Sequence, residues 1–365
     1  MFRKYYRALV VAAAWLVFAG LPATVGATIL PIPTESGWNG FVIAGAGYTD
    51  IESNTVAGNK VVDFSNENVS SLTASPDDDD TAHFSGAFEV RYTFGDQWQA
   101  FLGTSLLDRV TLDFAQQLGL RKQTDNIGTF QAGLLFSGIP SEVWEDPYQT
   151  DDTGPRNDTD RDAAGIRLQW DRIFGSGFEA TLSFRDIDID KERIGQNVTD
   201  PAVNPCNATC QSSLERDGDS AQLELAYLWE LSSRTILRPA VRFNDDDRDG
   251  DAQDRDGYTL SLTWGLDGDN FRTTVSGLYN DTEYDNANPI YGIHQDADGF
   301  VINGTLFYDL PTESRRWKAV GSITYGESDS DIDFHDNELL SVTLGVMYNF
   351  GNKAVRPRGT VIIDN

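Results

Sequence analysis

The residues after Ser36 repeat one pattern, in which apolar and polar side chains alternate over about ten positions before a turn interrupts them. Such alternation places successive side chains on opposite faces of a β-strand. In segment 84–94, Phe, Val and Tyr lie among the even positions, whereas Ser, Glu, Arg and Thr lie among the odd ones. Segments 221–231, 257–266 and 338–350 repeat the pattern. No helical period of comparable length appears, so the sequence predicts an all-β fold.

Fourteen segments of this kind follow one another along the chain. The first, GFVIAGAGY, is the least clear, because it fits either register of a strand. We expect the strands to begin near Gly40, Phe84, Trp98, Val110, Ile127, Ala164, Phe178, Ala221, Thr235, Gly257, Phe271, Gly299, Trp317 and Glu338.

The connections between these segments alternate in length. Short turns such as GDQ, LSSR, DGDN and PTESRR join strands in pairs, and long polar stretches join the pairs, with Asp108-Arg109 as the one exception. The long stretches are residues 52–83, 138–162, 188–219, 244–256, 280–297 and 326–337. Short periplasmic turns and long outer loops over an even strand number are typical of outer-membrane proteins. The sequence therefore predicts a closed antiparallel transmembrane β-barrel of about 14 strands, with 12 or 16 as alternatives.

Aromatic residues give an independent indication of a membrane. They gather beside the short turns, where amphipathic rings prefer the interface between lipid and water. An aromatic girdle is therefore expected at the periplasmic end. Its members would be Trp98, Trp170, Trp229, Trp264, Trp317, Phe94, Phe271, Tyr308 and Phe350.

The start of the chain has the features of an export signal. Three basic residues precede an apolar run from 8 to 21, and Val25-Gly26-Ala27 offers small residues for cleavage. We expect residues 1–27 to be a signal peptide, 28–38 a periplasmic segment, 39–350 the barrel and 351–365 a periplasmic extension. A retained N-terminal helix is the alternative. Export places the protein in the bacterial outer membrane.

The formal net charge of −29 argues against nucleic acid as a partner, because phosphate binding requires basic surfaces. Nearly all of the excess lies in the long connections. Cys206 and Cys210 share one polar segment, and an oxidising compartment favours a local disulfide between them. A metal or redox CxxxC site is the alternative.

The polar faces of the strands hold acids and bases in similar numbers. Charges that face lipid are unfavourable by ~2–4 kcal/mol near the midplane, so this face is assigned to the lumen. The pairs either stiffen the wall or form a polar conduit. The expected lumen residues are Glu89, Arg91, Asp113, Arg121, Arg167, Asp171, Glu179, Arg185, Glu224, Glu230, Arg238, Arg242, Arg272, Asp309 and Lys318.

One outer stretch, DDDRDGDAQDRD at 245–256, resembles the calcium loop of an EF-hand. Calcium prefers six to eight oxygen ligands, and alternating carboxylates before a Gly turn can supply them. Asp replaces the final Glu, and strands rather than helices are expected on both sides. An acidic surface loop without a specific site is the alternative. The candidate ligands are Asp245, Asp247, Asp249, Asp251 and Asp256.

No catalytic set is expected. The three histidines, His83, His294 and His335, fall in or beside outer loops. Asp333-Phe334-His335 resembles the Asp-x-His pair of the omptin proteases, but those are ten-stranded. An outer-membrane hydrolase therefore remains only a third hypothesis.

Both ends of the mature chain resemble those of known outer-membrane proteins. The mature start, TILPIPTESGWNGFVIAGAGY, resembles an uncharacterised family of proteobacterial outer-membrane proteins through Pro-Ile-Pro, Glu-Ser-Gly and Gly-Phe-Val. That resemblance implies a barrel and no known substrate. Tyr348-Asn349-Phe350 is similar to the terminal-strand signal read by the barrel assembly machinery, although residues 351–365 follow it here.

The leading hypothesis for function is a channel or facilitator for passive diffusion of small polar solutes. A non-conducting barrel is the second hypothesis; its acidic loops would bind divalent cations such as Ca²⁺ and contact lipopolysaccharide or partners.

Overall fold

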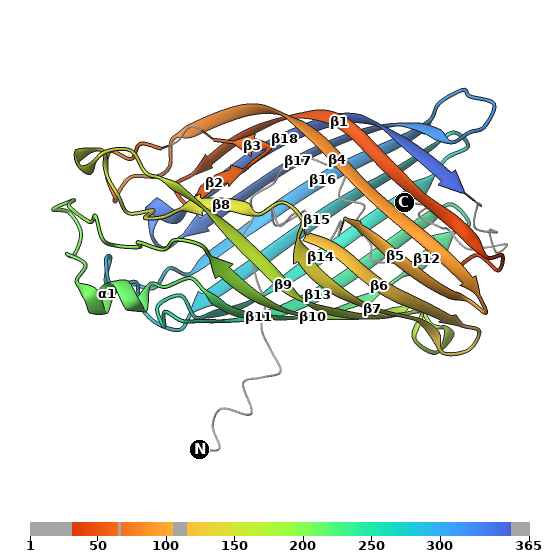
Figure 1. Cartoon of the computed structure of the whole chain (residues 1–365), viewed down its shortest axis with the longest axis horizontal. Coiled ribbons are helices and arrows are strands. Elements are labelled where there is room, and N and C mark those ends of the chain that lie inside the picture. Colours follow the sequence, from red (N-terminus) through yellow and green to blue (C-terminus); the bar gives the residue numbers. More distant parts are fainter. Residues whose placement is uncertain (1–30, 65–66, 105–114, 352–365) are drawn as a thin grey trace, which may run out of the picture.

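The computed structural model describes residues 31–64, 67–104 and 115–351, and these form one closed antiparallel barrel (Figure 1). Fourteen strands of this described part make up the wall. They are β1 (Gly37–Ser53), β4 (Asp78–Gly95), β5 (Trp98–Thr104), β6 (Ala115–Thr124), β7 (Gly128–Ser137), β9 (Asp158–Asp171), β10 (Phe178–Ile189), β11 (Gly218–Tyr227) with its continuation β12 (Trp229–Ser232), β13 (Thr235–Arg248), β14 (Arg255–Asp267), β15 (Phe271–Tyr284), β16 (Ala297–Asp309), β17 (Trp317–Ser330) and β18 (Asn337–Gly351).

The barrel closes through its first and last strands. β1 pairs with β18 from Asn39 opposite Gly351 to Ser53 opposite Asn337, and with β4 on its other side. Closure satisfies the backbone N–H and C=O groups that an open edge would leave unpaired, which a lipid environment demands. The predicted fold is confirmed.

The strands extend further at the outer end than the apolar alternation predicts. β4 begins at Asp78 rather than Phe84, and β9 at Asp158 rather than Ala164. Hydrogen bonding between neighbours continues into water, whereas apolar residues are needed only in lipid. The start predicted near Val110 lies outside the described residues, as do the predicted signal peptide and nearly all of the extension.

One predicted strand is interrupted. Segment 221–231 divides at Leu228 into β11 and β12, and the amide of Leu228 still donates to the carbonyl of Gly177, next to the first pair of β10 and β11.

The two faces of the wall differ as predicted. On β14, Leu260 and Leu262 are each 49% exposed on the outside, whereas the inward Thr259 and Thr263 are buried. Ring contacts such as Trp38–Tyr92, Phe130–Trp170 and Trp317–Tyr348 link neighbouring strands at the end with the short turns. The predicted girdle is therefore present at this end, and Trp38 belongs to it.

An outer aromatic belt lies at the other end of the apolar surface, on the neighbouring strands β15, β16 and β17. On each of these three strands, the outer aromatic residue is eight positions from the one in the periplasmic girdle. The pairs are Tyr279 and Phe271, Phe300 and Tyr308, and Tyr325 and Trp317. Eight residues span about 26 Å of strand, or roughly 20 Å of height after a tilt of ~40°. This height approaches the ~25 Å apolar band of outer-membrane barrels, so the belts mark the two membrane interfaces.

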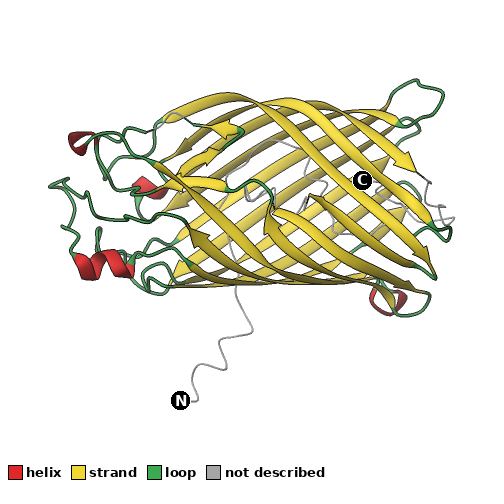
Figure 2. Ribbon diagram, viewed as in Figure 1, coloured by secondary structure: helices red, strands yellow, loops and turns green. Residues whose placement is uncertain are grey.

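The outer connections carry most of the remaining structure (Figure 2). β2 (Val56–Asn59) pairs with β3 (Val62–Asp63) and with β8 (Ser141–Trp144), which itself pairs with β9. A short helix, α1 (Ala208–Ser213), and the 3₁₀ turns η2 (Asp151–Thr153) and η4 (Asp333–His335) also lie there. The turn η3 (Ile173–Gly175) lies at the opposite end, between β9 and β10. No helix within the described ranges has the length and apolarity to cross a membrane.

Candidate functional site: the lumen and its outer cap

Two buried ion-pair networks line the inner wall. In the first, Arg238 lies between two acids, with its Nε 2.7 Å from Glu179 and a terminal nitrogen 2.8 Å from Glu224. Arg242 donates to the same Glu224 at 2.8 Å. Glu224 on β11 lies directly opposite Arg242 on β13, and Glu179 on the neighbouring β10 lies within reach of Arg238, so the charges neutralise each other inside the barrel.

The second network lies on β4 to β7. Glu89 accepts hydrogen bonds from Arg91 and Arg121. Arg121 also donates to Gln131 at 2.6 Å and lies 3.9 Å from the centre of the Phe101 ring. The cation–π contact and the carboxylate together hold this guanidinium flat against the wall.

Most other predicted lumen residues also lie inside. Arg167, Asp171, Arg185 and Arg272 are buried, and Lys318 lies 3.5 Å from the half-buried Asp309.

Two of the predicted lumen residues differ. Glu230 is exposed, because β12 lies at the rim of the barrel beside the short turn, where the side chain of Glu230 reaches water. Asp113 lies outside the described residues.

Part of the inner wall is apolar, which the alternation did not predict. Phe41, Ile43, Phe307, Val320 and Met347 are buried together on inward positions of β1, β16, β17 and β18. The only sequence signal was the first strand, whose two faces are both apolar.

The outer connections pack into one apolar cluster, here called the cap. Its buried members come from every described outer connection: 54–77, 138–157, 190–217, 249–254, 285–296 and 331–336. A barrel of this strand number is about 28 Å wide between backbones. The six described connections therefore bend over the lumen to meet. The buried members are Val69, Leu72, Tyr148, Ile194, Cys210, Leu214, Ala252, Ile290, Ile332 and Phe334.

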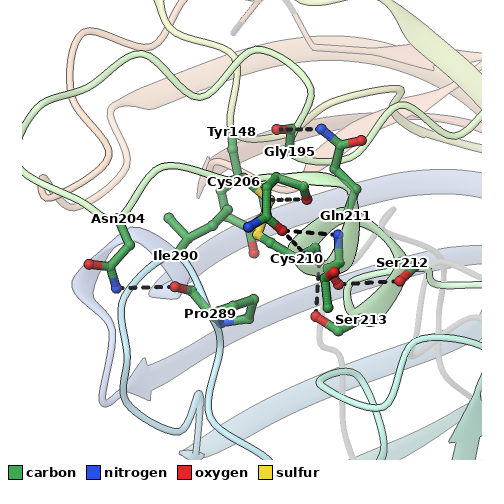
Figure 3. Close-up of a disulfide and its surroundings, with 12 residues drawn as sticks. Tyr148, Gly195, Asn204, Cys206, Cys210, Gln211, Ser212, Ser213, Pro289 and Ile290 are labelled. Carbon is green, nitrogen blue, oxygen red and sulfur yellow. Dashed lines mark hydrogen bonds between the residues drawn. A yellow bond between two sulfur atoms is a disulfide. The ribbon is translucent and has the colours of Figure 1, made fainter.

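The disulfide lies within the cap (Figure 3). Cys206 and Cys210 are bonded as predicted, and the bond ties the start of α1 to the preceding chain. The amide of Asn204 donates to the carbonyl of Pro289 at 3.1 Å, and Gln211 donates to the carbonyl of Gly195. The first bond joins the 190–217 connection to the 285–296 connection, and the second joins two parts of the 190–217 connection.

A buried carboxylate joins two more connections. Asp146 accepts hydrogen bonds from the backbone amides of Tyr148, Gly195 and Asn197. Burial raises the pKa of Asp146, although these donors oppose the shift. The cap is therefore held by polar bonds as well as by its apolar cluster.

A chain of hydrogen bonds runs along the underside of the cap. Asn288 donates to the hydroxyl of Tyr148 at 3.0 Å and to Gln295 at 3.3 Å. Gln295 and Arg255 both donate to the hydroxyl of Tyr284. This chain connects the cap to the charged residues of the wall below it.

A cavity of about 250 Å³ lies between the cap and the wall. Tyr148, Ile194 and His335 of the cap line it from above, and inward residues of β10 to β16, among them Arg185 and Asn280, line it from the sides. The sequence predicted two of its arginines, Arg185 and Arg242, as lumen residues, but it gave no signal for the cavity, which forms only where the cap meets the wall.

The predicted calcium loop does not form an EF-hand. Asp245 and Asp247 belong to β13 and Asp256 to β14, with Asp245 directly opposite Asp256. The side chain of Asp246 between them points inward and pairs with Arg248 and Arg255. Of the five candidate ligands, only Asp249 and Asp251 lie in the turn between β13 and β14. No group of three or more potential metal ligands gathers among the described residues. Calcium binding by this loop stays a prediction.

The acidic residues instead form an outward-facing ring just beyond the outer aromatic belt. Carboxylates lie directly opposite one another on successive strands, as Asp186 with Asp219 and Asp219 with Asp247. The same holds for Asp281 with Asp298. We call the following set the acidic ring: Asp50, Glu52, Asp78, Asp80, Asp162, Asp186, Asp188, Asp219, Asp245, Asp247, Asp256, Asp281, Glu283, Asp298, Glu327, Asp329 and Glu338.

The histidines are not arranged as a catalytic pair. His335 is buried in the cap beside Tyr148, whose hydroxyl lies 3.3 Å from its Nε2, whereas Asp333 is exposed. His83 contacts the hydroxyl of Thr49 on the inner wall, and His294 contacts the carbonyl of Tyr284.

Comparison with solved structures finds several outer-membrane proteins at low sequence identity. A Pseudomonas aeruginosa FadL homologue has a TM-score of 0.43 at 10% identity, over 86% of this chain and 90% of that one. An anion-selective porin from Comamonas acidovorans has a TM-score of 0.38 at 10% identity, over 87% and 100%. The outer membrane channel DcaP of Acinetobacter baumannii has a TM-score of 0.40 at 10% identity, over 87% and 97%. Similarity this low says nothing about a solute.

No curated protein sequence matches the chain. A family model does match it, over residues 37–349, from the start of β1 to within two residues of the end of β18. The chain belongs to the DUF2860 family, whose description is "protein of unknown function".

Proposed function

We propose that this protein is an outer-membrane channel or facilitator through which small polar solutes diffuse passively. The observation that carries the proposal is the cavity of about 250 Å³, which continues the charged, ion-paired inner wall up to the underside of the cap. Rows of paired charges form a polar lining that replaces part of a solute's hydration.

Liposome swelling with neutral sugars of increasing size tests this function. The variant Asn280→Trp adds a ring to a residue that lines the cavity, so we expect it to slow swelling several-fold. Gly277→Trp on the same strand is the matched control, because Gly277 faces outward with open space around it. Equal, background-level swelling with wild type and liposomes lacking protein would refute the proposal.

A second role is favoured by the acidic ring. Opposed carboxylates repel each other, and divalent cations that also contact lipopolysaccharide phosphates would relieve the repulsion. Calorimetric titration with Ca²⁺ should give a binding heat that falls in the double variant Asp219→Asn/Asp247→Asn. The exposed Asp152→Asn in η2 is the control. Identical, negligible heats for all three proteins would remove this role.

A further inference from the structure

The cavity beneath the cap is basic, although the protein is strongly acidic. Six arginines line it, against two acids, Glu142 and Asp246, which gives the lining a formal charge of +4. The arginines are Arg161, Arg185, Arg216, Arg242, Arg248 and Arg255.

Two of the six arginines also pair with acids behind the lining. Arg216 pairs with Glu192 at 2.5 Å, and Arg242 pairs with Glu224. These two acids and the two in the lining bring four negative charges against the six arginines. A guanidinium has five N–H donors, so a group that already holds one carboxylate keeps donors for a second anion.

The acidic ring does not share this space. Its members point outward, like the lipid-facing residues of the same strands. On β15, for example, Tyr279 and Asp281 both point outward, whereas Asn280 between them points inward and lines the cavity. Because successive side chains of a strand point to opposite faces, the acidic outer surface and the basic interior lie on the two sides of the same sheet.

Aliphatic side chains lie next to the arginines. On β10 the inward row reads Arg185, Ile187, Ile189 towards the outer end, and all three are buried and line the cavity. Val301 and Leu278 add apolar surface from β16 and β15. The cavity therefore offers both charge and apolar contact within one small volume.

We infer that this cavity binds small organic carboxylates with a short aliphatic chain. The planar guanidinium fork matches the two oxygens of a carboxylate, and the isoleucine row matches the chain. The cavity of about 250 Å³ suits a ligand with a short chain better than one with a long chain. The inference deepens the proposed function, since it names the class of solute that the channel would select.

Calorimetry on the purified full-length protein in detergent tests the inference without requiring transport. The probes are hexanoate, its neutral isostere hexanamide, and acetate, which lacks the chain. We expect hexanoate to bind at least tenfold more tightly than either of the others. Equal affinity for hexanoate and hexanamide, or for hexanoate and acetate, would overturn it.

Variants locate the site. The double variant Arg161→Gln/Arg185→Gln should bind hexanoate at least tenfold more weakly. Arg234→Gln is the control: it makes the same charge change per site on the exposed periplasmic turn and should leave hexanoate binding unchanged. Ile187→Ala, which removes no charge, should weaken hexanoate while leaving acetate unaffected. Unchanged hexanoate binding in the arginine double variant would refute the site. Sugar flux without hexanoate binding would refute the carboxylate site but not the proposed channel. Hexanoate binding without any flux would refute the proposed channel but not the carboxylate site.

Discussion

Buried charges on the inner wall are stable only as networks. The side chain of Arg238 is 3% exposed and pairs with two acids that are also buried, one of which, Glu224, pairs with Arg242 as well. Removing one member of such a network leaves a desolvated charge without its partner, which is more destabilising than losing an exposed pair. The sequence placed these residues on one face, but it could not say which acid each arginine contacts.

Arg238→Met should destabilise the barrel by about 3–5 kcal/mol, because Glu179 and Glu224 both lose their central cation. Urea unfolding in lipid vesicles measures the change. Arg234→Ala removes an arginine from an exposed pair with Asp269 and should change stability by less than ~1 kcal/mol. Similar losses for the two variants would show that the inner wall is well hydrated.

His335 makes the cap sensitive to acid. Burial lowers its pKa to about 3, below the ordinary ~6.5 of an exposed imidazole. An opened cap takes up the proton as pH falls below ~6.5, whereas the closed cap does not, so the stability from neutral His335 is lost progressively between about 6.5 and 3. Asp146 has a raised pKa and acts in the opposite direction.

Hydrogen exchange at pH 7 and pH 4.5, corrected for intrinsic rates, measures this effect. Amides of residues 190–217 should exchange at least tenfold faster at pH 4.5. His335→Gln remains neutral, so its exchange should not accelerate. The same acceleration in this variant would assign the pH response to other groups.

At the scale of elements, the cap is a small core built from connections. Leu214 and Phe334 are fully buried there, far from each other in the sequence. The cap covers the lumen, so loosening it should open the path to the cavity without disturbing the strands.

Leu214→Asp places a charge in this core and should raise single-channel conductance several-fold in planar bilayers. Ser212→Asp, exposed on the adjacent α1, adds the same charge outside the core and serves as the control. Unchanged conductance in Leu214→Asp would mean that the cap does not restrict the path.

The strands were predictable because lipid and lumen impose a period of two residues. Trp98, Phe178, Thr235, Phe271 and Trp317 begin strands where the alternation places them. The outer strand ends were missed because Asp78 and Asp158 lie in strands beyond the lipid, where no apolar period is needed. The cap and cavity were missed because they depend on contacts between distant connections, which leave no local period.

At the scale of the whole molecule, charge is divided by the barrel wall. The net charge of −29 belongs mainly to the outward ring and the connections, whereas the cavity has six arginines. A path governed by the total charge would favour cations, but a path through the cavity would favour anions, because the nearest charges set the field in a narrow lumen.

The reversal potential of single channels in a tenfold KCl gradient tests the central claim that solutes pass through this cavity. We predict a potential with the sign of anion preference, and a shift towards zero in Arg161→Gln/Arg185→Gln. A cation-selective potential would contradict the account, as would the absence of current from both the wild type and Leu214→Asp.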